Sequence, residues 1–318
     1  MKISAEEAAR CLRAADDVLI LMHRNPDGDA IGSGLALCHV LRSLGKRARV
    51  LCADPFPRSF KFLEETYTQD SFVPKTIVAV DIADPQLLGS LSQYAAQVDL
   101  CIDHHISNTL YAEKTYVVPE ASSTAEVLME IFDLLGVSVD QTVATCLYTG
   151  MATDTGCFKY GNTSPHTHRC AARLMEVGIP YAEINYHFFD CKSKARLLIE
   201  RAALDSMEFH FNDRCALLVI SKQMLAQTGA DAADYDGLSG MARQVEGVEV
   251  GITIREQENG EYKVSLRTAF SLDASAICKS LGGGGHKQAA GCTLKGSLEQ
   301  VKQTLLCAVE TALTGGKS

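Results

Sequence analysis

The sequence has no excess of basic residues. Its 318 residues include 30 lysines and arginines against 39 aspartates and glutamates, which gives a formal net charge of −9. Proteins that bind long duplexes through a broad basic face are normally basic, so this balance argues against long duplex as a ligand. A short phosphorylated substrate remains compatible with the balance, because bound metal ions would reverse the local field.

The sequence also lacks an apolar run of the roughly 18 residues that a membrane-spanning helix needs. Residues 1–17 form an amphipathic, charged helical pattern rather than a signal peptide. Twelve cysteines are present, but their spacing is irregular and no Cys-x-x-Cys pair occurs. We therefore expect reduced thiols in a cytoplasmic protein that does not bind a membrane.

The length and the pattern along the chain predict two domains. A chain of 318 residues exceeds the size at which one core usually stops growing. Strand-like and helix-like segments alternate in the first part, as in a mainly parallel α/β sheet. Residues 191–203 are charged and helical with little apolar periodicity, which indicates a connector. The predicted organisation is an α/β domain at 1–188, a helical linker at 189–206 and a smaller α/β domain at 207–318.

Individual elements follow from apolar periodicity and turn residues. The motif from Ser123 to Glu126 matches a capping box and predicts a helix that runs through Leu135. Asn259 and Gly260 predict a hairpin turn. The other predicted strands are 18–22, 48–53, 77–80, 98–102, 215–221, 248–256 and 262–268, and the other predicted helices are 31–44, 85–96, 141–152, 165–177, 274–280 and 297–313.

Acidic and histidine side chains follow the apolar runs of the first domain. They occur in HRNPDGDA, TIVAVDIAD, CIDHHIS and GMATDTG, and they are His23, Asp27, Asp29, Asp81, His104 and Asp154. Ligands collect outside the carboxyl ends of the strands in an open α/β sheet, where residues remote in sequence converge. Four carboxylates there would repel one another strongly unless cations held them together. The pattern therefore predicts two divalent metals and a metal-dependent hydrolase.

Two of these motifs leave alternatives open. Asn25 to Gly28 has turn chemistry, so a plain surface turn is the alternative to a metal-binding loop. His104 and His105 are adjacent after a strand, and side chains alternate along a strand. We therefore expect one of the two histidines to face the metals and the other to contact the substrate.

A run of four glycines at 282–285 precedes His286 and a helix-like stretch. The run is not a Walker A motif, because no Gly-Lys-Ser/Thr follows it. Either it is a flexible loop, or its bare backbone N–H groups wrap a phosphate. Arg267 in VSLRT offers a bidentate fork for phosphate, and an inert edge-strand arginine is the alternative.

The motifs resemble a known family. HRNPDGDAIGS, VAVDIAD, IDHHISN and TDTGCF, in this order and at this spacing, resemble the motifs of the DHH-superfamily phosphoesterases. GGGGHKQAAG at 282–291 resembles the hallmark of the DHH-associated C-terminal domain. Length and domain content most resemble the nanoRNase (oligoribonuclease) and pAp-phosphatase subgroup. The resemblance implies a mainly parallel DHH domain, a smaller substrate-binding domain and an active site in the cleft between them.

The resemblance also implies a role for each site residue. His23 and Asp27 hold one metal, His104, Asp29 and Asp154 hold the other, and Asp81 bridges both. These ligands suit two Mn²⁺ ions, with Mg²⁺ or Co²⁺ as substitutes. Asp81 and His105 are the catalytic residues, and His105 contacts the scissile phosphate. The implied substrate-binding residues are Arg267, Gly283, Gly284, Gly285, His286, Asn108 and Ser122.

The implied activity is that of an Mn²⁺-dependent oligoribonuclease-type exonuclease. It would hydrolyse short oligoribonucleotides to mononucleotides and 3′-phosphoadenosine 5′-phosphate (pAp) to AMP. A phosphodiesterase for linear or cyclic dinucleotides, pApA or cyclic di-AMP, would use the same site. Further alternatives are an inorganic pyrophosphatase, a RecJ-like exonuclease and a non-catalytic nucleotide-binding protein. A homodimer is compatible with the sequence, which does not fix the oligomeric state.

Overall fold

The computed structural model describes residues 1–235, 237–269 and 271–315 of the chain. The chain divides into two compact units, and the boundary along the chain falls between Cys191 and Lys192. Residues 316–318, at the end of the predicted second domain, lie outside the described residues.

The first unit is built on a sheet of five parallel strands, which confirms the predicted mainly parallel sheet. The strand order is β2–β1–β3–β4–β5. The strands are β1 (Val18–Leu21), β2 (Ala48–Leu51), β3 (Thr76–Val80), β4 (Leu100–Asp103) and β5 (Lys114–Val117). β1 is buried along its whole length, as a strand covered on both faces requires. The sequence did not predict β5, whose four residues include two polar ones.

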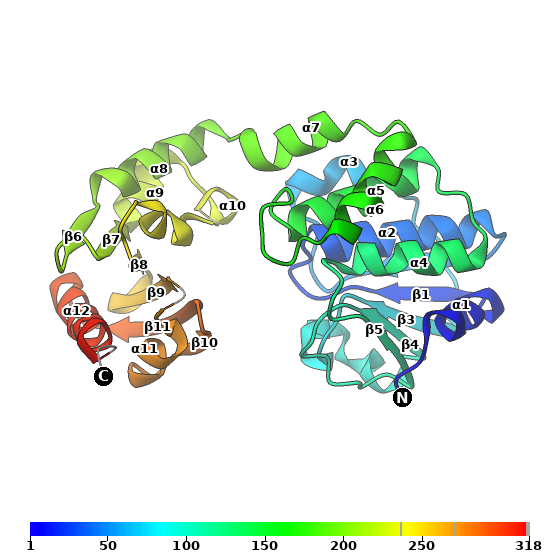
Figure 1. Cartoon of the computed structure of the whole chain (residues 1–318), viewed down its shortest axis with the longest axis horizontal. Coiled ribbons are helices and arrows are strands. Elements are labelled where there is room, and N and C mark those ends of the chain that lie inside the picture. Colours follow the sequence, from blue (N-terminus) through cyan, green and yellow to red (C-terminus); the bar gives the residue numbers. More distant parts are fainter. Residues whose placement is uncertain (236, 270, 316–318) are drawn as a thin grey trace. The chain divides into compact units, whose positions relative to one another are not determined.

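Helices cover both faces of this sheet. The main core includes side chains from α1 (Ala5–Ala14), α2 (Gly28–Ser43), α4 (Thr124–Leu135), α5 (Gln141–Asp154) and α6 (Pro165–Glu176), which pack together on one side (Figure 1). A smaller core joins the other face to η2 (Pro85–Gln97). η2 is a 3₁₀ segment rather than the predicted helix, because Gly89 interrupts it at φ 56°. The remaining short elements are η1 (Arg58–Phe60), α3 (Lys61–Glu64), α7 (Tyr181–Asn185) and η3 (Tyr186–Asp190).

Close packing of α2 against α5 brings two parts of the site together. A Cβ on Gly28 would lie 2.1 Å from Thr153 Oγ1, and a Cβ on Gly32 would lie 2.3 Å from the carbonyl oxygen of Cys146. These contacts show that the helices are antiparallel and in near-backbone contact, which only glycine permits. The start of α2 therefore lies beside the end of α5.

The second unit contains a mixed sheet of six strands in the order β10–β11–β9–β8–β7–β6. β7 and β8 pair in parallel, and the other neighbours pair in the antiparallel sense. The strands are β6 (Glu208–His210), β7 (Cys215–Ile220), β8 (Val250–Glu256), β9 (Glu261–Thr268), β10 (Gly284–His286) and β11 (Ala289–Lys295). The turn between β8 and β9 has Asn259 and Gly260 at φ 57° and 68°, as the predicted hairpin turn requires.

Each face of the second sheet packs against its own set of helices (Figure 1). One face meets α11 (Ala274–Ser280) and α12 (Leu298–Gly315). The other face meets α8 (Lys194–Asp205), α9 (Lys222–Thr228), α10 (Ala232–Tyr235) and η4 (Leu238–Gln244).

Helix α8 differs from the predicted connector, because it belongs to the core of the second unit. Ile199 and Ala203, one turn apart, are fully buried against that core. Leu197 and Leu204 are 54% and 51% exposed. Leucines on the exposed side of α8 weaken the apolar periodicity, and this explains why the sequence suggested a connector.

The glycine run also differs from the prediction, because its last two glycines belong to the edge strand β10, and the strand β11 rather than a helix comes next. β10 pairs with β11, and Gly285 lies opposite Ala290. Gly285 has φ 144°, and a Cβ there would lie 2.6 Å from the backbone of Ala290. Glycine is therefore needed at this position for the strand itself.

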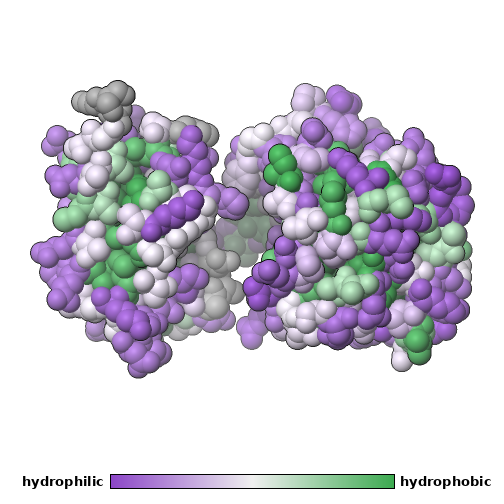
Figure 2. All heavy atoms as spheres, turned by 90° about the horizontal axis from the view of Figure 1, so that it is seen from below, coloured by the Kyte–Doolittle hydropathy of each residue, from purple (hydrophilic) through white to green (hydrophobic). Residues whose placement is uncertain are grey.

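The surface seen in Figure 2 is mixed, with hydrophobic patches interrupted by hydrophilic ones. Among the described residues, no helix is both long and apolar enough to cross a membrane.

Candidate active site

The structure brings the six predicted ligands together where β1, β3 and β4 end. His23 follows β1, Asp81 follows β3 and His104 follows β4. Asp27 and Asp29 lie at the start of α2, and Asp154 is the last residue of α5. The antiparallel packing of α2 and α5 thus supplies carboxylates from two helix ends to one edge of the sheet.

Asp81 lies between two histidines. Its Oδ2 is 3.5 Å from His23 Nε2, and its Oδ1 is 3.7 Å from His104 Nε2. On the first side, His23 Nε2 is also 3.6 Å from Asp27 Oδ1. The ligand atoms of His23, Asp27 and Asp81 lie within 4.8 Å of one another, close enough to hold one metal ion.

On the other side, His104 is the common neighbour of the remaining carboxylates. Its Nε2 lies 3.9 Å from Asp29 Oδ2 and 3.8 Å from Asp154 Oδ2. A second compact group of donors consists of Asp81, His104 and His105. Both histidines therefore approach Asp81, whereas the alternation argument allowed only one. The reason is that β4 ends at Asp103, so strand alternation no longer applies to His104 and His105.

Asp81 is held in a sparsely populated backbone conformation. Its φ is 58°, and its backbone N–H donates to the carbonyl oxygen of Ile102 at 3.0 Å. The Thr124 hydroxyl donates to Asp81 Oδ1 at 2.9 Å, and only 2% of Asp81 is exposed. Left-handed backbone is tolerated by aspartate, and surrounding structure must hold it in place. Here it turns the carboxylate from the end of β3 toward both histidines.

The N-terminus of α4 holds Asp29. The carboxylate accepts hydrogen bonds from the backbone N–H groups of Thr124 and Ala125 at 2.6 and 2.9 Å, and from the Ser33 hydroxyl at 3.1 Å. Such a position favours a negative charge. Burial, together with the charges of Asp81 and Asp154, nevertheless raises the pKa of Asp29 well above its ordinary value.

The loop before α2 forms a tight turn and also carries residues of the candidate site. Asn25 has φ 51°, as the predicted turn chemistry requires. Asp27 caps α2, and its Oδ1 accepts from the N–H groups of Asp29 and Ala30 at 3.1 and 3.0 Å. The same carboxylate faces His23. The turn and the candidate metal-binding loop are therefore one structure.

Burial and the crowded charges of the cluster shift the pKa values of its side chains. Burial and then the neighbouring charge of Asp81 raise the pKa of Asp154 to about 6, against the opposing effect of His104. Burial disfavours protonated His23, but hydrogen bonds with Asp27 and Asp81 outweigh this and raise its pKa to about 11. Crowded carboxylates thus retain protons or attract protonated imidazole. Divalent cations would satisfy the same charges, and carboxylate oxygens with imidazole nitrogens form a donor set that suits them.

Asp103 is a part of the site that sequence reasoning missed. It is fully buried and its Oδ1 lies 2.8 Å from His105 Nδ1. Its Oδ2 accepts from Asn108 Nδ2 at 2.6 Å, and the hydrogen bond to Asp103 is the main cause that raises the pKa of His105 to about 9. Asn108, predicted to bind substrate, therefore lies behind His105 and supports its orienting partner. Asp103 stands in the DHH motif itself, which was the available signal.

Ser122 lies in a different environment from the one predicted. It is fully buried, and its hydroxyl and backbone N–H donate to Glu126 Oε2. The Ser123 hydroxyl accepts from the Glu126 N–H at 3.1 Å, which is one half of the predicted capping box. The other half does not form, because the Glu126 side chain is bound to Ser122 and Thr167. Ser122 is thus in the framework beneath the site and not on its surface.

Asn162 is a second contact that the sequence did not indicate. Its Nδ2 lies 3.3 Å from Asp154 Oδ2 and 3.0 Å from the carbonyl oxygen of Ser122. No motif marked it, because its partners are eight and forty residues away.

The second unit places the other predicted residues around β9 and β10. Arg267 donates from Nη2 to the Ser239 hydroxyl at 3.2 Å. Arg267, Gly284 and Gly285 line a cavity of about 440 Å³. Gly283 instead packs against β11, where a Cβ would lie 2.2 Å from the carbonyl oxygen of Gly291. His286 is exposed at the end of β10.

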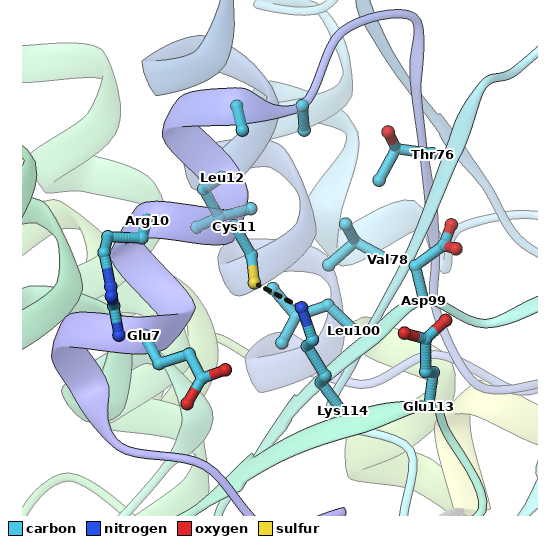
Figure 3. Close-up of a pocket in the computed structure, with 12 residues that line it drawn as sticks. Glu7, Arg10, Cys11, Leu12, Thr76, Val78, Asp99, Leu100, Glu113 and Lys114 are labelled. Atoms are coloured by element: carbon cyan, nitrogen blue, oxygen red, sulfur yellow. Dashed lines mark hydrogen bonds between the residues drawn. The ribbon is translucent and has the colours of Figure 1, made fainter.

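A further cavity of the first unit, about 480 Å³ in volume, lies between α1 and the starts of β3, β4 and β5 (Figure 3). Lys114 Nζ lies 3.5 Å from Cys11 Sγ there. Ligands of open α/β sheets bind at the carboxyl ends of strands, whereas this cavity is at the opposite ends. It contains none of the predicted site residues.

Comparisons with known proteins agree with this architecture. Residues 17–151 match the DHH family N-terminal domain, and residues 216–315 match the DHHA1 domain. The bifunctional oligoribonuclease and PAP phosphatase NrnA of Thermus thermophilus is 38% identical, over 96% of this chain and 93% of that protein. The cyclic-di-AMP phosphodiesterase GdpP of Geobacillus thermodenitrificans is 26% identical, over 95% of this chain and 48% of that protein.

A solved structure has the same fold. The crystal structure of an exopolyphosphatase-related protein from Bacteroides fragilis has a TM-score of 0.88 and 25% identity, and covers 99% of this chain and 97% of its own. Fold, site and relatives define a metal-dependent hydrolase of phosphoester bonds. The chain belongs to the DHH family and carries both its N-terminal domain and a DHHA1 domain.

Proposed function

We propose that the protein hydrolyses short oligoribonucleotides to mononucleotides and converts pAp to AMP, with two divalent metal ions, Mn²⁺ foremost. The position of Asp81 between His23 and His104, with further carboxylates on both sides, carries this proposal. The relative from T. thermophilus, named for these two activities, supports the choice of substrates.

Six residues would hold the ions. His23 and Asp27 would bind one, His104, Asp29 and Asp154 the other, and Asp81 both. Bound ions supply a nucleophilic water at neutral pH and neutralise charge on the phosphate. The left-handed turn at Asp81 and the α4 N-terminus at Asp29 preorganise the carboxylates for this task.

His105 would act directly on the substrate. Asp103 accepts from its Nδ1, which fixes the ring and leaves Nε2 for a phosphate oxygen. Because the hydrogen bond to Asp103 raises the pKa of His105 to about 9, the ring is doubly protonated at neutral pH, so Nε2 also holds a proton that can stabilise the phosphate or pass to the leaving oxygen. Asn108 keeps Asp103 in place.

The second unit would bind the rest of the nucleotide. Arg267 offers a bidentate fork for phosphate, and Gly284 and Gly285 allow close approach of the backbone. The net charge of −9 supports short substrates, because a long strand needs a continuous basic track.

A dinucleotide phosphodiesterase is the second candidate, since the relative from Geobacillus thermodenitrificans is named for cyclic di-AMP. The test compares the Mn²⁺-loaded protein on RNA dinucleotides, pentanucleotides, a long oligonucleotide, pAp, pApA and cyclic di-AMP. We expect the short RNAs and pAp to be consumed first, with Asp81→Ala as the inactive control. Preference for cyclic di-AMP would select the second candidate, and preference for the long strand would refute both.

A further inference from the structure

Two buried cysteines of the second unit flank the glycine run along the chain. Cys278 is on α11 and Cys292 is on β11, and both side chains belong to the same apolar core. Both thiols are free, and the proposed function uses neither of them. The segment between the two cysteines contains Gly284 and Gly285, which line the nucleotide cavity.

Gly283 contacts both cysteines. Its backbone N–H donates to the carbonyl oxygen of Cys278 at 2.8 Å. A Cβ on Gly283 would lie 2.5 Å from Cys292 Cβ and 2.8 Å from Cys292 Cα. A side chain at this position would therefore force α11 and β11 apart. The glycine holds the end of the helix close to the strand, and the two cysteines come together there.

The two thiols interact directly. The hydrogen bond between them raises the pKa of the Cys278 thiol, which burial raises further, and lowers the pKa of the Cys292 thiol. Cys278 is thus the proton donor, and a thiolate forms first at Cys292. Among the described residues, this is the one pair of cysteines whose thiols hydrogen-bond to each other. The thiolate is the reactive form in thiol oxidation, so Cys292 is the nucleophile of the pair.

The surroundings also distinguish the two thiols. Cys292 is 6% exposed, whereas Cys278 is 0% exposed. Cys292 lines the cavity of about 440 Å³, together with the cations Lys263 and Arg267. Nearby positive charge favours a thiolate. A small oxidant that enters this cavity therefore reaches Cys292 before Cys278.

We propose that Cys292 and Cys278 are an oxidation site, at which a peroxide converts the two thiols into a reversible disulfide. The Cys292 thiolate attacks one peroxide oxygen and the O–O bond breaks, which gives a sulfenic acid and a hydroxide; the hydroxide takes up a proton and becomes water. The Cys278 sulfur then attacks the Cys292 sulfur, the S–O bond breaks, and the Cys278 proton leaves with the hydroxide as a second water. Two thiols and one peroxide thus give one disulfide and two waters. A dithiol reductant reverses the change by thiol–disulfide exchange.

The disulfide closes the loop 278–292 around the glycine run. Bonded sulfur atoms lie about 2.05 Å apart, closer than any hydrogen-bonded pair. The end of α11 is therefore drawn toward β11 at Gly283, where the two elements are already in contact. Gly284 and Gly285 follow directly and line the nucleotide cavity. We expect oxidation to weaken nucleotide binding, and this consequence rests on the proposed function.

The first test maps the disulfide in the full-length protein. The reduced protein is treated with hydrogen peroxide, free thiols are alkylated, and the tryptic peptides are analysed by mass spectrometry. Lys279 and Lys287 separate the two cysteines, so trypsin places them on different peptides. We expect these peptides to be linked, and dithiothreitol should separate them. Absence of the link at a peroxide dose that oxidises the exposed Cys307 would overturn the proposal.

Two variants test which thiol reacts first. Cys278→Ala should accumulate a sulfenic acid at Cys292, detected as a dimedone adduct, because the second thiol is missing. In Cys292→Ala, Cys278 should stay reduced. Cys307→Ala is the matched control, since Cys307 is exposed in the same unit, and the link should form in it as in the parent. A sulfenic acid at Cys278 in Cys292→Ala, with none at Cys292 in Cys278→Ala, would contradict the proposal.

The second test measures the effect on hydrolysis. Peroxide should raise KM for pAp several-fold in the parent, dithiothreitol should restore it, and hydrolysis of bis-p-nitrophenyl phosphate should not change. KM of Cys278→Ala for pAp should be insensitive to the same treatment. An unchanged KM in parent protein that carries the link would refute the effect on binding. If the reduced parent hydrolyses neither substrate, the proposed function fails, while the peptide map still decides whether the disulfide forms.

Discussion

Asp154→Asn should stabilise the metal-free protein while impairing its metal site. Burial and the charge of Asp81 raise the pKa of Asp154 from 3.8 to about 6, and its side chain is 29% exposed. Each pKa unit corresponds to ~1.4 kcal/mol, so ionised Asp154 costs the folded state about 2–3 kcal/mol. Asparagine keeps the shape and removes that charge.

The raised pKa of Asp154 also determines in which direction the stability of the parent changes with pH. An acid whose pKa is raised by folding lowers stability as pH rises from its unfolded to its folded pKa. The parent should therefore lose stability between about pH 4 and pH 6 through this group, and the loss is complete above that window. The gain of Asp154→Asn should accordingly be near zero at about pH 4 and full at about pH 8.

Calorimetry of the metal-free parent and of Asp154→Asn at both pH values measures this gain in stability. A gain of 2–3 kcal/mol corresponds to roughly 4–12 °C in the melting temperature of a unit of this size. Asp205→Asn is the control, because Asp205 is 73% exposed and lies in the second unit. Added Mn²⁺ should then stabilise the parent more than the variant. Equal melting temperatures of parent and variant at the higher pH would refute the argument from charge crowding.

Three further predictions concern the site. Asp81→Ala should abolish hydrolysis and lower bound Mn²⁺, measured by metal analysis, because Asp81 faces both histidines; near-parental turnover would exclude a bridging role. His104→Ala should lower metal content, whereas His105→Ala should retain metal and lower turnover, and the reverse order would exchange their roles. Arg267→Ala should raise KM for pAp about ten- to a hundredfold and leave bis-p-nitrophenyl phosphate hydrolysis unchanged. Equal losses on both substrates would make Arg267 a structural residue.

The strands of the first sheet and the residues that follow them could be predicted from the sequence. Apolar runs such as Val18–Leu21 are local signals, and a parallel sheet forces their carboxyl ends to one edge. Asp81 and His104 could therefore be assigned to one site without knowledge of the strand order. Asp154 is the last residue of a helix, and its place depends on the glycine contacts between α2 and α5.

Other features depend on contacts that a local pattern does not encode. Glu126 suits a capping box by its spacing, yet the buried hydroxyls of Ser122 and Thr167 take its carboxylate. Gly285 is compatible with a loop, but pairing with Ala290 makes it part of a strand. Thr167 lies 41 residues from Glu126, so local spacing does not reveal its hydrogen bond, and the conformation of Gly285 depends on its pairing with the following strand β11.

The sequence by itself determined the class of fold, the family and the ligand types, because periodicity, turn residues and motif order are properties of neighbouring residues. Only the tertiary structure decided that Asp103 orients His105, that α4 holds Asp29, and that Arg255 and Lys263 lie opposite each other on neighbouring strands. These contacts arise where separate elements pack together. Their energies depend on burial and distance, which residue spacing alone does not specify.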